Sequence, residues 1–170
     1  LFEDGTLTDA PAEVIARCIR YKAGVVERDE KERGERRKLN LGHTFAHAIE
    51  WEAHNREQSM GEVNAGVHGI SHGEAVAMGI IMAAEASEYY YADDKSQPVI
   101  VQGLAKKLTE DFRRCGLPVE CPYPITTLAE AMKKDKKSEN GIVHFILIRA
   151  IGDVRIEDLP VDDVVSRISK

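Results

Sequence analysis

The sequence has 170 residues, of which 43% are hydrophobic and 31% are charged, and its formal net charge is -6 at pH 7. These totals fit a globular protein of one domain, or of two small ones. The acidic balance argues against a general nucleic-acid binder, and charges interrupt every apolar run well before the roughly 18 residues of a membrane span. Three cysteines without C-x-x-C spacing predict reduced thiols in a cytoplasmic protein.

The first segments predict a loop, a helix and a turn. Residues 1–10 are expected to form a loop, and Pro11 suits the first turn of a helix that runs to about Glu27. Lys22 lies on the apolar face of this helix, so its charge must either extend to water or meet an anion. Glu32 lies in the charged turn that follows, where it is either a surface carboxylate paired with a neighbouring arginine or a functional acid.

The stretch RRKLNLGHTFAHAIE, residues 36–50, is predicted to be one helix with a polar stripe. Its polar residues fall within one arc of roughly 80°. A solvated helix face usually carries lysine and glutamate pairs, whereas this stripe suits metal, phosphate and proton transfer, so we expect it to face a wet cleft. Gly42 costs about 1 kcal/mol relative to alanine inside a helix, which indicates that another backbone or a ligand packs closely there. The stripe consists of Arg36, Asn40, His43, His47 and Glu50.

Residues 52–70 are polar and aperiodic, and are expected to form a long loop. The sequence Ser71-His72-Gly73-Glu74 is a capping box that opens an apolar helix running to about Tyr90, predicted to be the core helix. His72 lies in its first turn, where the positive end of the helix dipole disfavours an imidazolium. A metal ligand must be an uncharged imidazole, so this position suits one.

The remaining elements are shorter. Helices are expected over residues 98–115, from Thr127 into the lysines at 133–137, and near residues 161–168. Between the last two, strands at 143–148 and 154–156 predict a hairpin within residues 142–157. The predicted fold class is therefore mainly α, a helical bundle-like domain with a short β-hairpin near the C-terminus. No glycine-rich dinucleotide motif is present.

Histidines are the best candidates for metal binding. His43 and His72 are favoured, but His43 and His47, one turn apart on a helix, could also share a metal. A catalytic zinc site has three protein ligands and one open position. Residue types alone leave both pairs open.

Four separated segments closely resemble the C-terminal domain of the 3-dehydroquinate synthase family. They keep the family's order and most of its gaps. The resemblance implies that residues 1–170 form this helical domain, without the N-terminal NAD-binding domain. The segments are KAGVVERDE at 22–30, LNLGHTFAHAIE at 39–50, HGEAVAMG at 72–79 and DKK at 135–137.

The resemblance also implies an activity. The family converts 3-deoxy-D-arabino-heptulosonate 7-phosphate to 3-dehydroquinate with release of phosphate, in the shikimate pathway to aromatic amino acids. It is a lyase that uses a divalent metal, Zn2+ or Co2+, and NAD bound by the N-terminal domain. The expected partners are the phosphorylated substrate, that N-terminal domain and a second subunit in a homodimer, with no nucleic acid and no membrane.

The resemblance assigns roles residue by residue. The third metal ligand is an acidic residue of the N-terminal domain, and no residue of this chain is expected to bind NAD. Two departures from the family pattern are Ala46, which stands where glycine is usual, and a segment between Glu50 and His72 that is longer by about ten residues. The implied roles are metal binding by His43 and His72, acid–base catalysis by Glu32 and His47, and substrate binding by Lys22, Arg36, Asn40 and Lys136.

Two other readings remain open at the level of sequence. The chain could be the corresponding domain of another sugar-phosphate cyclase, or a non-catalytic helical fragment. The intact set of candidate residues argues against the second reading. Without a nucleotide-binding domain, we expect this chain by itself neither to bind NAD nor to turn over substrate.

Overall fold

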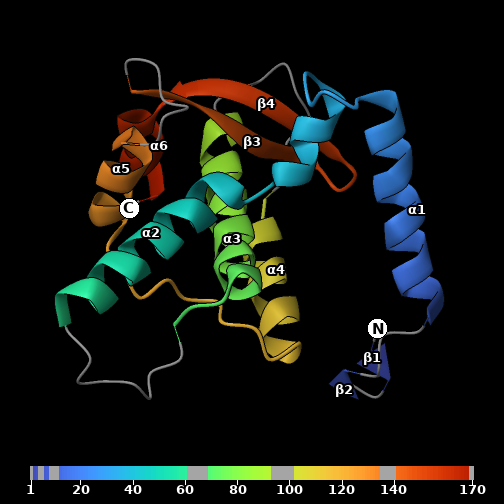
Figure 1. Ribbon diagram of the computed structural model, residues 1–170, viewed down its shortest axis with the longest axis horizontal. Helices are drawn as coiled ribbons and strands as arrows, with labels where there is room; N and C mark the ends of the chain where they lie inside the picture. Colours follow the sequence, from blue (N-terminus) through green and yellow to red (C-terminus); the bar gives the residue numbers. More distant parts are fainter. Residues whose placement is uncertain are drawn as a thin grey trace.

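The structure is a computed structural model that describes residues 2–3, 6–7, 12–60, 69–92, 102–134 and 141–168. The described part is mainly helical, with an antiparallel hairpin near the C-terminus, as predicted (Figure 1). None of its helices is both long and apolar enough to cross a membrane. Its elements are β1 Phe2–Glu3, β2 Thr6–Leu7, α1 Ala12–Arg28, η1 Glu35–Asn40, α2 His43–Met60, α3 His72–Ala92, α4 Leu104–Arg114, α5 Ile125–Lys134, β3 Ile142–Ala150, β4 Asp153–Pro160 and α6 Val161–Ile168.

Helix α3 is the core helix, as the apolar pattern predicted. It runs through the middle of the molecule, with α2 and α4 beside it and the β3–β4 hairpin across one end (Figure 1). Most of its buried residues are alanine, glycine or serine, and such small residues let neighbouring backbones approach closely. The buried Ser87 links this helix to the hairpin, because its Oγ donates to the Ala83 carbonyl and accepts the Ile148 N–H at 2.8 Å.

The capping box at the start of α3 is also present. The backbone N–H and the hydroxyl of Ser71 both donate to Glu74 Oε2, at 2.8 and 2.7 Å. These bonds hold the pKa of Glu74 below its ordinary value, the bond from the Ser71 hydroxyl being the larger cause. The box therefore fixes the point at which α3 begins, with His72 as its first residue.

The backbone just before α2 meets the middle of α3 at two glycines, Gly42 and Gly79. A Cβ on Gly79 would lie 2.3 Å from the Gly42 carbonyl oxygen, and a Cβ on Gly42 would lie 2.7 Å from the Ile80 nitrogen. Gly42 also has a positive φ of 80°, which side chains disfavour. The close packing predicted at Gly42 is thus confirmed, and the partner is the backbone of α3.

The prediction of one continuous helix over residues 36–50 was wrong. The chain forms the 3-10 helix η1 up to Asn40, breaks at Leu41 and Gly42, and starts α2 at His43. The break has a physical cause, because the left-handed backbone at Gly42 cannot belong to an α-helix. Arg36 and Asn40 are therefore not on the helix that carries the histidines.

The long loop predicted for residues 52–70 was also wrong over residues 52–60. Helix α2 continues to Met60, with Ala53 buried as an anchor. An ion pair between Arg56 and Glu52, at 2.7 Å, supports the exposed face of this extension. Residues 61–68 lie outside the described part.

Elements at the two ends differ from prediction in smaller ways. The loop expected over residues 1–10 contains the short antiparallel pair β1–β2, with Phe2 opposite Leu7. Helix α4 begins at Leu104, and the predicted start at residue 98 lies outside the described residues. Helix α5 begins at Ile125, two residues before the predicted start, whereas α6 matches its prediction.

Helix α1 lies at the edge of the molecule, and its principal contact is with η1 (Figure 1). Of its apolar face, Val25 is buried, but Ile15 and Ile19 are 51% and 63% exposed. Lys22 is exposed as well. The charge of Lys22 therefore extends to water in the described structure, and its contact with an anion stays a prediction.

The glycine contact generates a stability prediction. Gly79→Ala should lower the free energy of unfolding by about 1–3 kcal/mol, because its methyl would overlap the Gly42 carbonyl and push α2 away from α3. Urea denaturation followed by circular dichroism measures this change.

The matched control is Gly73→Ala on the same helix, where an added Cβ meets nothing within 4 Å; its stability should stay within about 1 kcal/mol of the parent. Equal stabilities of the two variants would contradict the packing described.

Candidate active-site cleft

The turn between α1 and η1 is organised by the carboxylate of Asp29. Its Oδ1 accepts the Arg33 N–H at 2.9 Å, and its Oδ2 accepts the N–H groups of Gly34 and Arg36 at 2.8 and 3.0 Å. These backbone hydrogen bonds, that from Arg33 first, hold the pKa of Asp29 below its ordinary value. A side chain that occupies three backbone donors fixes the path of the turn.

Glu32 lies inside this turn with an unusual backbone. Its φ is 52°, and among the described residues it is the sole non-glycine residue with a positive φ. Such conformations cost free energy and concentrate at functional sites. The Glu32 carboxylate accepts a hydrogen bond from Asn40 Nδ2 at 2.7 Å, and Arg36 Nε lies 4.0 Å from its other oxygen. The turn thus presents a carboxylate and an amide together.

Three histidine rings cluster where α2 and α3 begin. The ring centroids of His43 and His72 are 5.4 Å apart, and those of His43 and His47 are 5.7 Å apart. His43 is the first residue of α2, and His72 is the first residue of α3. The structure therefore brings the two favoured metal-ligand candidates together, with His47 one turn further along α2.

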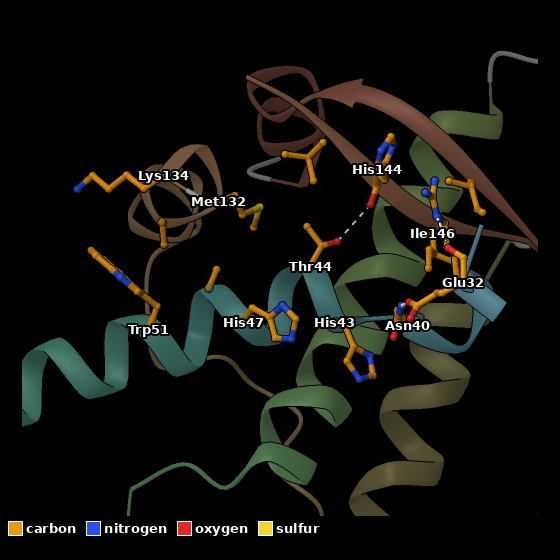
Figure 2. A pocket seen from close by; sticks show the side chains of 15 residues that line it. Glu32, Asn40, His43, Thr44, His47, Trp51, Met132, Lys134, His144 and Ile146 are labelled. Atoms are coloured by element: carbon orange, nitrogen blue, oxygen red, sulfur yellow. Dashed lines mark hydrogen bonds between the residues drawn. The ribbon is translucent and has the colours of Figure 1, made fainter. Parts of the chain in front are cut away.

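A cleft of about 1000 Å3 connects His43 and His47 with the turn, and His72 is not among its lining residues. Glu32 and Asn40 lie together at one side, His43 and His47 project from α2, and Trp51 and Lys134 close the other side (Figure 2). A hydrogen bond from Thr44 Oγ1 to the His144 carbonyl, at 3.4 Å, joins α2 to the hairpin above. The lining residues are Glu32, Arg37, Asn40, His43, Thr44, His47, Ala48, Trp51, Ala131, Met132, Lys134, Val143, His144, Ile146 and Ile156.

Not every candidate residue reaches this cleft. Lys22 lines a separate groove between α1 and η1, with Leu39 and Tyr21 among its neighbours. Arg36 is absent from the cleft lining, and its Nη1 donates to the Glu30 carbonyl at 2.8 Å. Lys136 lies outside the described residues. The expectation that Lys22, Arg36 and Asn40 share one cleft therefore holds for Asn40 alone.

The histidine cluster fits part of a metal site. Within the described ranges, no three histidine, cysteine or acidic side chains are placed to hold a metal ion together. His43 and His72 nevertheless form a donor pair of the kind that zinc and cobalt accept. Each has its Nδ1 near an oxygen acceptor, the Leu41 carbonyl at 3.3 Å and Glu50 Oε1 at 2.9 Å. This is the outer-shell arrangement common around metal-binding histidines.

Comparison with known families identifies this arrangement. The family model described as 3-dehydroquinate synthase C-terminal matches residues 4–138. The chain belongs to this family. The match contains the Asp29 turn, the glycine contact and all three clustered histidines.

Several 3-dehydroquinate synthases are similar to the chain in sequence. That of Geobacillus kaustophilus is 36% identical over 167 residues, which are 95% of this chain and 40% of the relative. That of Halalkalibacterium halodurans is 40% identical over 149 residues, covering 86% of this chain and 36% of the relative. That of Pyrococcus abyssi is 38% identical over 148 residues, with coverage of 87% and 38%. The chain thus spans about two fifths of these relatives.

The fold also resembles a solved structure. A crystal structure of 2-deoxy-scyllo-inosose synthase, in complex with carbaglucose-6-phosphate, NAD+ and Co2+, matches with a TM-score of 0.64 at 20% identity. The match covers 95% of this chain and 42% of that one. At this identity the likeness supports the fold.

The alanine that departs from the 3-dehydroquinate synthase motif fits its position. Ala46 is 0% exposed and belongs to the main apolar core. Its N–H donates to the Gly42 carbonyl at 2.9 Å, and the Gly79 side of α3 lies opposite. The extra methyl is therefore buried in contact with the core.

Sequence reasoning missed several residues of the cleft. Trp51 lies one turn beyond His47, so extending the helix past residue 50 would have found it. Lys134 stacks over the Trp51 ring, with its Nζ 5.1 Å from the ring centroid. His144 comes from the hairpin, a hundred residues from Thr44 in the chain, and no local pattern could place it here.

The Asp29 turn generates a pH prediction. Asp29→Asn should lower the stability of the protein near pH 7, because an amide cannot accept the three N–H groups as a carboxylate does. The lowered pKa means that Asp29 stabilises the fold above its unfolded-state pKa, and that this contribution is lost as pH falls through the folded-state pKa. The stability difference between parent and variant should therefore stay constant above about pH 4, the ordinary pKa of an aspartate, and shrink as pH falls below it.

Urea denaturation at a series of pH values measures that difference. The control is Glu30→Gln, which removes a carboxylate from the same turn while keeping the backbone carbonyl that Arg36 contacts. A difference for Asp29→Asn that is independent of pH would show that the carboxylate does not organise the turn.

Proposed function

We propose that this chain is the metal- and substrate-binding part of a 3-dehydroquinate synthase. In this proposal it acts with a nucleotide-binding region to convert 3-deoxy-D-arabino-heptulosonate 7-phosphate to 3-dehydroquinate and phosphate. The observation that carries the proposal is a cluster of three histidine rings, two of which line one cleft with the Glu32–Asn40 pair. Membership in the family supports the same activity.

Proton transfer falls to Glu32 and His47. His47 projects into the cleft one turn from His43, so it can exchange a proton with a group bound at the metal candidates (Figure 2). Glu32 keeps a fixed orientation through the bond from Asn40 and the neighbouring Arg36. The two proton-transfer groups lie at different points of one cleft, as an acid and a base acting on one substrate require.

Positive side chains are available for the anionic groups of the substrate. Lys134 and Arg37 line the cleft at different places, and a substrate with a carboxylate and a phosphate needs cations at separate points. Lys22, Arg36 and Lys136 remain candidate binding residues through the family motif. Asn40 can donate to a substrate hydroxyl as well as to Glu32.

Cofactors complete the proposal. His43 and His72 would hold a divalent metal, zinc or cobalt, which when bound polarises substrate hydroxyls and stabilises negative charge on oxygen. NAD would be held by the N-terminal region and supplies hydride transfer. The proposal includes a homodimer and a cytoplasmic location, the latter supported by the free thiols of Cys18, Cys115 and Cys121.

A second candidate is another sugar-phosphate cyclase. The likeness to 2-deoxy-scyllo-inosose synthase, a structure that contains carbaglucose-6-phosphate, NAD+ and Co2+, favours this alternative at the level of the fold. The two candidates differ in substrate, because the heptulosonate carries a carboxylate that a glucose phosphate lacks. A non-catalytic role is the third reading, and it predicts neither metal nor substrate binding.

The metal assignment is tested by Co2+ titration of the chain. The parent should bind Co2+ weakly through two imidazoles, and either His43→Ala or His72→Ala should weaken binding by about tenfold or more, because each removes a direct ligand. His47→Ala should bind within about threefold of the parent, as expected for a residue that is not a ligand. Calorimetry, with quenching of the single Trp51 as a second signal, measures the affinities.

The matched control is His54→Ala, on the same helix, where the imidazole is exposed and bonded to Gln58. A loss of affinity in His47→Ala that clearly exceeds the loss in His72→Ala would overturn the assignment in favour of a His43–His47 site.

Trp51 also reports substrate class. Titration with 3-deoxy-D-arabino-heptulosonate 7-phosphate should change its fluorescence at lower concentration than glucose 6-phosphate does, because the extra carboxylate meets the cations of the cleft. Inorganic phosphate controls for general anion binding. Tighter binding of glucose 6-phosphate would favour the alternative cyclase.

A further inference from the structure

The two candidate metal ligands share a feature that the family comparison does not explain. In each, Nδ1 faces an oxygen: His43 Nδ1 is 3.3 Å from the Leu41 carbonyl, and His72 Nδ1 is 2.9 Å from Glu50 Oε1. A carbonyl and a carboxylate oxygen can only accept hydrogen bonds, so Nδ1 must carry the proton in both rings. In an uncharged ring, Nε2 then carries the lone pair.

For His72, this arrangement depends on one side chain. Glu50 lies on α2 one turn beyond His47, and it reaches across to the first residue of α3. The pair is partly exposed, with 33% of the Glu50 side chain and 60% of the His72 side chain accessible. A polar contact so open to water contributes little to stability. The contact between Glu50 and His72 therefore matters for the orientation of the His72 ring and not for the stability of the fold.

We propose that Glu50 is a positioning residue that holds His72 in the Nδ1–H tautomer and presents its Nε2 to the divalent metal. The inference rests on the proposed function, because it takes His72 as a metal ligand. Carboxylate–histidine pairs of this kind fix both the tautomer and the direction of the ring, and their loss typically weakens metal binding about 10–100-fold. His43 needs no such side chain, because its Nδ1 faces the backbone carbonyl of Leu41, two residues earlier in the chain.

The test uses two variants of Glu50 and one control. Glu50→Ala removes the acceptor, whereas Glu50→Gln keeps the shape and one acceptor oxygen but loses the charge. Glu52→Gln is the matched control, because its carboxylate lies on the same helix and pairs with Arg56 instead. Circular dichroism verifies that every variant retains the helical fold.

The first measurement is the tautomer of His72 in the metal-free chain. Nitrogen-15 NMR of the imidazoles distinguishes Nδ1–H from Nε2–H, and the His72 signals are identified by their loss in His72→Gln. The parent and Glu52→Gln should show Nδ1–H, and Glu50→Ala should lose this preference. An unchanged His72 tautomer in Glu50→Ala overturns the proposal.

The second measurement is Co2+ affinity by calorimetry. Glu50→Ala should bind about tenfold more weakly or worse, Glu50→Gln should lie between it and the parent, and Glu52→Gln should match the parent. A Glu50→Ala affinity within twofold of the parent overturns the proposal. If the parent takes up no Co2+, the metal step of the proposed function fails, while the tautomer measurement still decides whether Glu50 holds His72.

Discussion

The contact between Gly42 and Gly79 is the constraint on which the candidate site depends. Two backbones meet there at a distance that leaves no room for a Cβ on either residue. His43 follows Gly42 directly, and His72 lies two turns before Gly79 on α3. The separation of the two imidazoles is therefore set by a contact between main chains in the core, which is far stiffer than a contact between surface side chains.

The two halves of the cleft are held in different ways. The histidines stand on α2 and α3, whose shared face is buried apolar surface. Glu32 and Asn40 stand on a turn and a 3-10 helix with no fully buried residue in η1, and Asp29 holds their backbone through hydrogen bonds. Apolar packing thus fixes the metal candidates together with His47, and polar contacts fix Glu32. The hydrogen bonds of the turn depend on pH, since they need an ionised Asp29 carboxylate, whereas the apolar packing of α2 and α3 does not.

The chain supplies part of the ligand set that the proposed metal site needs. Two imidazoles leave a tetrahedral ion to find its other ligands elsewhere. The chain also spans about two fifths of the relatives it matches. Under the proposed function, metal affinity then depends on how well His43 and His72 are arranged in advance. Outer contacts at Leu41 and Glu50 reduce the freedom of both rings, which lowers the cost of binding.

The sequence by itself determined most of the helices, the capping box, the C-terminal hairpin and the family, because these depend on local patterns and on motifs in fixed order. It also identified His43, His47 and His72 as chemically distinctive. It could not show that the chain breaks between η1 and α2, since the left-handed Gly42 at that break packs against the backbone of α3, a segment distant in the chain. Tertiary structure alone decided that His144 and Lys134 enclose the cleft, that Glu50 meets His72, and that Lys22 lies outside. Those outcomes depend on packing between segments distant in the chain, which no local pattern encodes.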